Sequence, residues 1–287
     1  MRVLITGGAG QLGRDLASLL GASAFALDHS DCDITKPSAV EAAIARVQPD
    51  AIVNAGAWTD VDGCEDDPER ARLVNATGAG NVARVAGDAL VVQVSTDYVF
   101  DGRGNRAYVE TDATNPLSVY GASKLEGERE VSSDARRWAV VRSAWLYGVG
   151  TRNFVAAILR AARTRERLQV VDDQVGSPTS TPDLASALVA LIERGSTGVL
   201  HGVNEGECSR FGFARAIFEE AGLDPTRVEA VTTAAMPRPA TRPAYAPMDG
   251  VAWRAAGLPA LRHWREALAE VVPGVIKSLD AEAAAAR

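Results

Sequence analysis

Short apolar runs alternate with longer stretches of helical spacing along the first half of the chain. The apolar runs are continuous, as in strands that are buried on both faces, and they cover residues 3–5, 24–27, 51–53 and 90–94. The intervening stretches repeat apolar side chains every three or four positions, and they cover residues 11–20, 37–47 and 68–86. Strands that alternate with amphipathic helices predict an α/β fold with a doubly wound, Rossmann-type parallel sheet.

The pattern continues less regularly in the second half of the chain. It predicts helices at 118–131 and 153–162 and a strand at 138–141. Residues 236–247 are rich in proline and arginine and predict an ordered loop, and the later apolar positions, including Trp253 and Trp264, indicate a smaller, mostly helical C-terminal lobe with a frayed tail at 281–287. We therefore expect a nucleotide-binding domain at 1–150, and a region at 151–287 that completes the sheet and forms a substrate lobe.

Composition and charge exclude several classes of protein. The 287 residues carry a formal net charge of −7, which disfavours a nucleic-acid partner. No apolar run is long enough for a signal peptide or a membrane span. The three cysteines and three histidines are scattered, so they predict neither disulfides nor a metal site, and they favour a cytoplasmic protein.

A glycine-rich turn directly follows the first predicted strand. Gly7, Gly10 and Gly13 are spaced Gly-x-x-Gly-x-x-Gly, with Gln11 and Leu12 opening the next helix. Glycines at such a turn permit positive φ, let backbone N–H groups approach a pyrophosphate, and allow close packing of helix on strand. The helix N-terminus then favours the phosphate charge. Glycines can also simply turn a loop, but the position between strand and helix favours dinucleotide binding.

Acidic residues after the second strand extend this hypothesis. Asp28 lies 18 residues after Gly10, where a carboxylate can bond the adenosine ribose, which favours NADH over NADPH. Asp33 and Ile34 suit the adenine amine and ring face. A solvated residue at a strand end is the alternative interpretation of Asp28, and NADH and NADPH both stay open.

The chemistry of the chain is predicted to centre on Tyr120, Lys124 and Thr96. Tyr120 and Lys124 are four positions apart on one predicted helix, so they share a face. We expect the ammonium to lower the pKa of the phenol, which is ordinarily near 10. Thr96 ends the fourth strand, in the ligand crevice of a doubly wound sheet. Such a tyrosine–lysine pair is also common on protein surfaces; its agreement with the glycine turn favours catalysis.

With these residues assembled, the chain resembles the extended short-chain dehydrogenase/reductase family. More narrowly, it is similar to the dTDP-4-dehydrorhamnose reductases over nearly its whole length. The most specific matches are residues 7–13 and 94–102. Further matches lie at residues 54–62, 116–121 and 142–148.

The resemblance implies a reductase that transfers hydride from NADH or NADPH to the C4 ketone of dTDP-4-dehydro-L-rhamnose, giving dTDP-L-rhamnose. Thr96, Tyr120 and Lys124 would form the catalytic triad. Cofactor contacts would come from Ala55, Gly56, Ala57, Tyr120 and Lys124, and substrate contacts from Thr96, Asp97, Tyr98, Trp145, Asn153 and Arg242. Trp145 is also consistent with core packing, and Asn153 with an ordinary helix start.

Rival functions remain open on the sequence. A nucleotide-sugar epimerase or dehydratase has the same fold, but dehydratases need an Asp-Glu pair where this chain has Asp97-Tyr98. A non-catalytic regulatory subunit, related to that of methionine adenosyltransferase, and a reductase of another nucleotide-linked ketosugar are further alternatives. Some family members bind Mg²⁺ at a dimer interface through C-terminal acidic residues. The alanine-rich end of this chain gives no support for Mg²⁺, and leaves both monomer and homodimer open.

Overall fold

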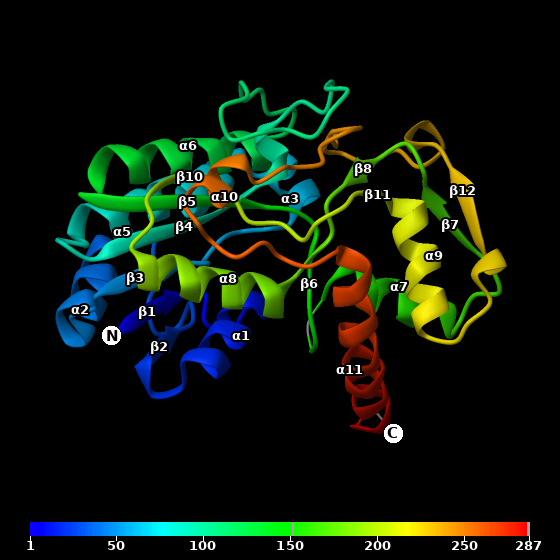
Figure 1. Cartoon of the computed structure of the whole chain (residues 1–287), viewed down its shortest axis with the longest axis horizontal. Coiled ribbons are helices and arrows are strands. Elements are labelled where there is room, and N and C mark those ends of the chain that lie inside the picture. Colours follow the sequence, from blue (N-terminus) through cyan, green and yellow to red (C-terminus); the bar gives the residue numbers. More distant parts are fainter. Residues whose placement is uncertain (151, 286–287) are drawn as a thin grey trace.

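A sheet of six parallel strands forms the centre of the computed structural model, which describes residues 1–150 and 152–285 (Figure 1). The strands follow the order β10-β5-β4-β3-β1-β2. Their bounds are β1 Val3–Thr6, β2 Ala24–Leu27, β3 Ala51–Asn54, β4 Leu90–Thr96, β5 Arg137–Ser143 and β10 Gly198–His201. This order confirms the predicted doubly wound topology. Because it reverses between β1 and β3, a ligand crevice is expected at the carboxyl ends of these strands.

Helices cover both faces of the sheet (Figure 1). On one face, Leu16 of α1 and Leu188 of α8 join the buried cluster of the strands. On the other, α2, α5 and α6 pack over Ile52 and Val91. The bounds are α1 Gln11–Leu20, α2 Pro37–Val47, α5 Gly78–Val85, α6 Val119–Asp134 and α8 Thr181–Arg194. Burial on both faces explains why the strands are apolar without alternation.

The helix predicted at 68–86 is interrupted. A short helix α3 Val61–Asp66 comes first, and α4 Pro68–Arg72 then passes through a π-helical turn, Leu73–Thr77, into α5. The turn holds the buried Asn75, whose amide donates to the Trp58 carbonyl at 3.1 Å and to the Ser123 hydroxyl at 3.0 Å. The π turn therefore ties the loop after β3 to α6. Apolar periodicity alone cannot reveal it, because it adds a single residue to the helix.

A smaller lobe lies beside the sheet (Figure 1). Its core surrounds Phe213, and its elements are α7 Phe154–Ala162, α9 Arg210–Glu220, α11 Trp264–Ala285 and the parallel pair β7 Leu168–Val171 and β12 Val228–Val231. Short strands link it to the sheet: β6 Leu146–Tyr147, β8 Val175–Gly176, β9 Thr179–Ser180 and β11 Cys208–Ser209. The short helix α10 Val251–Ala255 packs against β10, in the core cluster of the sheet.

Two expectations about this region need comment. The frayed tail predicted from residue 281 is helical as far as Ala285, and residues 286 and 287 lie outside the described part. The boundary predicted at 150/151 falls at residue 151, which is also outside it. Within the described ranges, no helix has the length and apolar character needed to cross a bilayer.

Candidate active site

The glycine turn between β1 and α1 is a cradle built from backbone. Gly7 has φ +69°, and a Cβ there would lie 2.8 Å from the backbone of Ala55, at the end of β3. A Cβ on Gly13 would overlap the Gly7 carbonyl oxygen. Gly10 is the N-cap of α1 and provides no side chain to satisfy the first-turn N–H groups. Unsatisfied N–H groups at a helix N-terminus suit a phosphate, so the turn fits a dinucleotide.

Two cavities flank this turn and gather most of the predicted cofactor residues. The first, of about 310 Å³, is lined by Gly7, Gly10, Gln11, Leu12, Gly13, Ala55, Ala57, Tyr120 and Lys124, among others. The second, of about 370 Å³, is lined by Gly7, Gly10, Asp28, Ile34, Ala55, Gly56 and Ala57, with other residues that include Arg70. The fold thus brings the strand-end segments and α6 to one crevice, where a dinucleotide has room on both sides of the turn.

The two aspartates after β2 differ in position. The Asp28 carboxylate accepts from the Ser30 N–H at 2.7 Å, so its loop holds it at the rim of the second cavity. Asp33 does not line either cavity. Its carboxylate accepts from the Thr35 hydroxyl at 2.7 Å and pairs with Lys36 at 3.3 Å. The structure therefore gives Asp33 a role in its own turn and does not support the expected adenine contact.

Tyr120 and Lys124 lie one turn apart on α6, which begins where the Ser118 hydroxyl accepts from the Gly121 N–H at 3.1 Å. Both side chains line the first cavity with the glycine turn. Lys124 is only 4% exposed, and its ammonium donates to the Val94 carbonyl at 2.7 Å. Burial lowers the pKa of Lys124 to about 8, against the opposing effect of Glu128.

The pKa of the Tyr120 phenol departs from expectation. We expected Lys124 to lower it, but burial raises the pKa well above its usual range. Asp97 raises it further, and the Thr96 hydroxyl lowers it. The Lys124 ammonium is instead directed to the Val94 backbone. The phenol therefore stays protonated at neutral pH, which is the form that a proton donor needs.

Thr96 and Asp97 meet Tyr120 at the end of β4. The Thr96 hydroxyl donates to the Asp97 carboxylate at 3.0 Å and accepts from the Tyr98 N–H at 3.2 Å. Asp97 is 3% exposed, and burial raises its pKa to about 6. The Tyr98 ring meets the Tyr120 ring edge to face, with 5.5 Å between centroids. A hydroxyl, a phenol and a buried acid therefore share one corner of the site.

A larger cleft, of about 790 Å³, opens between this corner and the second lobe. Trp145 lines it and is held at φ +48°, a conformation that few residues other than glycine adopt. A Cβ on Gly176 would lie 2.6 Å from its indole, so Gly176 leaves the space that the ring fills. Residues held in such rare conformations cluster at functional sites, which favours a site role for Trp145 over core packing alone.

Arginines give the cleft its charge. The Arg210 guanidinium stacks 3.6 Å from the Trp145 ring centroid, and the salt bridges of the described residues do not include it. Arg242 and Arg238 also line the cleft, but both pair with Asp62, at 2.6 and 2.7 Å. The sequence analysis missed Arg210 because no motif surrounds it; only the packing of α9 brings it to the cleft.

Asn153 contributes mainly to local structure. Its side chain caps α7 by accepting from the Ala156 N–H at 3.0 Å. Its amide group donates to Gln11 at 2.9 Å and to the Gly148 carbonyl at 2.8 Å. Asn153 lines the cleft, but these contacts match the helix-start alternative and join the cleft to the N-terminus of α1.

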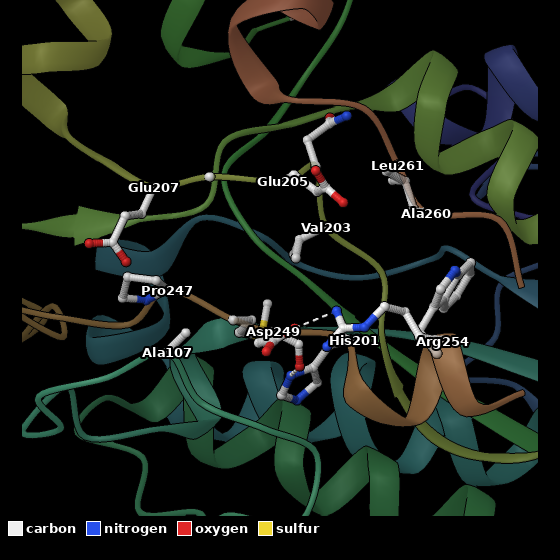
Figure 2. A pocket seen from close by; sticks show the side chains of 15 residues that line it. Ala107, His201, Val203, Glu205, Glu207, Pro247, Asp249, Arg254, Ala260 and Leu261 are labelled. Carbon is white, nitrogen blue, oxygen red and sulfur yellow. Dashed lines mark hydrogen bonds and ion pairs between the residues drawn. The ribbon is translucent and has the colours of Figure 1, made fainter.

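A further cavity, of about 390 Å³, lies beside β10 (Figure 2). Figure 2 shows the Arg254 guanidinium paired with Asp249, at 2.6 Å, and the His201 ring pointing away from Glu205 and Leu261. It shares no lining residue with the three cavities along the crevice and cleft. None of the predicted site residues line it, so we do not assign the reaction to it.

Comparisons with known proteins identify the family of this chain. Residues 1–276 match the family model described as the RmlD substrate binding domain. The chain belongs to this family. It is 49% identical over 279 residues to dTDP-4-dehydrorhamnose reductase from Mycobacterium tuberculosis, covering 93% of this chain and 91% of the relative. The Streptomyces griseus enzyme of the same name is 44% identical over 287 residues, covering 96% of this chain and 94% of that one.

A solved relative adds information about the cofactor. The dTDP-4-dehydrorhamnose reductase of Bacillus anthracis, solved in complex with NADP, superposes with a TM-score of 0.91 at 36% identity. The match covers 94% of this chain and 98% of that chain. The family is therefore one of NAD(P)H-dependent reductases, as the resemblance implied.

Proposed function

We propose that this chain is a dTDP-4-dehydrorhamnose reductase, which uses NADH or NADPH to reduce the C4 ketone of dTDP-4-dehydro-L-rhamnose to dTDP-L-rhamnose. The observation that carries the proposal is the position of the Tyr120 phenol, which lines one cavity with Lys124 and the glycine turn. A proton donor beside a dinucleotide cradle suits ketone reduction. The 49% identity to a relative of that name supports the choice of substrate.

The crevice would hold the dinucleotide largely through backbone. The pyrophosphate would lie on the turn formed by Gly7, Gly10, Gln11, Leu12 and Gly13, where α1 presents N–H groups. Asp28 and Ile34 would meet the adenosine, and the segment Ala55, Gly56 and Ala57 would cover the middle of the cofactor. Lys124 would bond the nicotinamide ribose. When bound, the dinucleotide supplies the hydride.

The chain itself supplies the proton and polarises the ketone. Tyr120 gives its phenolic proton to the carbonyl oxygen as hydride arrives at the carbon. Proton transfer by a positioned acid contributes about 10²–10⁴-fold to a rate. Thr96 donates a second hydrogen bond to the same oxygen, and one such donor is worth on the order of 10²–10³-fold. Two donors converging on one oxygen stabilise the alkoxide that forms.

The cleft would hold the rest of the nucleotide sugar. Asp97, Tyr98 and Trp145 would lie nearest the ketone and contact the sugar, and Asn153 and Arg242 would lie farther along the cleft. Arginine side chains in the cleft suit the diphosphate. Residues 1–150 would then bind the dinucleotide, and the region from 151 onward would complete the sheet and form the substrate lobe.

The proposal also covers location and assembly. We propose that the protein works in the cytoplasm as a monomer or homodimer. The three cysteines are free in the structure, in agreement with a reducing compartment.

The rival functions make different predictions for cofactor use. An epimerase or dehydratase regenerates its NAD and turns over without added reductant, and a regulatory subunit binds cofactor without turnover. Residue 98 is tyrosine, where a dehydratase needs a second acid. Oxidation of one NAD(P)H for each ketone reduced distinguishes the reductase from all of these.

The direct test follows oxidation of NADH and of NADPH with dTDP-4-dehydrorhamnose, in wild type and in Tyr120→Phe. Phenylalanine keeps the ring and removes the proton donor, so we expect kcat to fall about 10²–10⁴-fold, with cofactor affinity unchanged in a fluorescence titration. Full activity in the variant would remove Tyr120 from the mechanism. No reductant-dependent turnover in wild type would refute the proposed function.

A further inference from the structure

The Thr96 hydroxyl has too few protons for the contacts expected of it. A hydroxyl carries one proton to donate and two lone pairs that accept. In the structure Thr96 Oγ1 accepts from the Tyr98 N–H at 3.2 Å and directs its proton to Asp97 Oδ1 at 3.0 Å. With its proton so placed, Thr96 has none left for a substrate ketone. For Thr96 to donate to a ketone, either its hydroxyl turns away from Asp97, or the Asp97 carboxyl becomes protonated.

The surroundings of Asp97 favour protonation of its carboxyl group. The side chain is 3% exposed, and the salt bridges within 4.0 Å among the described residues do not include it. The charged or titratable groups that face it are Arg210 of α9, Tyr98 in its own turn and Tyr120 of α6. Burial raises the pKa of Asp97 to about 6, while Arg210 opposes the rise. The neutral and the ionised forms of the Asp97 carboxyl are therefore both populated near neutral pH.

The backbone conformation of Trp145 indicates that the surroundings of Asp97 are held in a fixed arrangement. Trp145 is held at φ +48°, and its indole lies close enough to Asp97 to lower the pKa of that carboxyl. Arg210 stacks on the same indole, 3.6 Å from the ring centroid. Strain of this kind persists where the surrounding structure fixes a functional arrangement. Here the arrangement encloses one carboxyl group.

We propose that Asp97 is a positioning residue that acts in its neutral form and directs the Thr96 hydroxyl toward the substrate ketone. The neutral acid donates its own proton to Thr96 Oγ1. Thr96 then accepts from Asp97 and from the Tyr98 N–H, which fills both lone pairs. Its single proton is directed to the side of the Tyr120 phenol, with which Thr96 is in contact, where the ketone oxygen would lie. Ionised Asp97 takes that proton back. No covalent bond to carbon changes, and the inference rests on the proposed function because it requires a ketone beside Thr96.

The first test measures the carboxyl group itself. Wild-type protein labelled with ¹³C at aspartate side-chain carboxyls is titrated by NMR, and the Asp97→Asn variant identifies the Asp97 resonance by its loss. We expect a midpoint near pH 6. A midpoint at or below the ordinary aspartate value of about 4 overturns the proposal, because the neutral form would then be too rare to act. This measurement requires no turnover.

The second test compares the pH dependence of kcat in wild type, Asp97→Asn and Thr96→Val. In wild type, kcat falls as pH rises through the Asp97 transition. Asparagine is isosteric and donates from its amide at every pH, so its profile lacks this fall. The ratio of kcat in Asp97→Asn to kcat in wild type therefore rises by about tenfold per pH unit above the transition.

Thr96→Val serves as the matched variant, because it removes the hydroxyl that Asp97 is proposed to direct. We expect it to lose on the order of 10²–10³-fold in kcat and to lose the Asp97-dependent fall. Parallel profiles for wild type and Asp97→Asn overturn the proposal. If wild type fails to reduce the ketone at any pH, the proposed function fails and this inference falls with it, whereas parallel profiles in an active enzyme refute the inference alone.

Discussion

The crevice proposed for the dinucleotide and the cleft proposed for the substrate share Leu146 and Arg152 in their linings, but they are built in different ways. The crevice is mostly backbone: Gly7 and Gly13 close against neighbouring main chain, and the first turn of α1 has no side-chain cap. The cleft is mostly side chains brought from distant elements, including Arg210, Arg242 and Trp145. A backbone site needs particular residues at fixed spacing, whereas a side-chain site needs only the final fold. Substitutions should therefore disrupt the crevice through backbone clashes and the cleft through the loss of individual side chains.

The substitution that we expect to disrupt the crevice most is the addition of a methyl group at Gly7. Gly7→Ala combines a positive φ with a Cβ 2.8 Å from the Ala55 backbone. We expect unfolding free energy to fall by roughly 2–5 kcal/mol and NADPH affinity to fall with it, measured by denaturant melts and fluorescence titration. Gly21→Ala is the matched control, since Gly21 has φ +53° and no atom within 4 Å of the added Cβ.

The control should lose only about 1 kcal/mol, the cost of the backbone conformation alone, and should keep its NADPH affinity. Equal losses in the two glycine variants would contradict the cradle, because they would show that the contact with Ala55 has no energetic effect.

A second test concerns the buried charge of Lys124. Burial lowers its pKa to about 8, below the ordinary value of 10.5. Between these values the unfolded chain binds more protons than the folded chain, so stability rises with pH. We expect the unfolding free energy of wild type, relative to Lys124→Met, to increase by about 3 kcal/mol from pH 8 to pH 10.5. Denaturant melts at several pH values measure this difference, and a constant difference would show that Lys124 is not desolvated.

Removal of a charged side chain from the cleft should have a smaller effect than the changes in the crevice. Among the residues that the structure describes, no carboxylate forms a salt bridge with Arg210, whereas Asp62 pairs with both Arg238 and Arg242. We expect Arg210→Ala to raise KM for the nucleotide sugar about tenfold, the equivalent of 1.4 kcal/mol, and to leave KM for NADPH unchanged. Arg238→Ala is the comparison, because that side chain is 61% exposed and already paired. A larger effect at Arg238 than at Arg210 would contradict this account of the cleft.

The same contrast explains what the sequence could predict. Continuous apolar strands, amphipathic helices and the spacing of Gly7, Gly10 and Gly13 indicated the sheet and the crevice, because each depends on neighbours in the chain. The predicted helix at 68–86 concealed a π turn, since its periodicity shifts by only one residue. The prediction that Asp33 contacts the adenine did not anticipate the Thr35 contact of its carboxylate, because that contact is not part of any motif.

Electrostatics were the least predictable feature. The four-residue spacing correctly placed Tyr120 and Lys124 on one face of α6, but it could not show that Lys124 donates to the Val94 carbonyl. Burial depends on the assembled fold, so the pKa of Tyr120 rises where the sequence suggested a fall. Arg210 was missed for the same reason, since only the packing of α9 brings it to Trp145.

The central claim is that hydride passes from the dinucleotide to a ketone carbon while Tyr120 protonates the oxygen. The most direct measurement uses NADPH carrying deuterium at the transferable C4 position, with dTDP-4-dehydrorhamnose as substrate and NMR of the product. We expect one deuterium at C4 of the product sugar for each NADPH oxidised. Product formed without deuterium at C4, or without NADPH oxidation, would contradict the account.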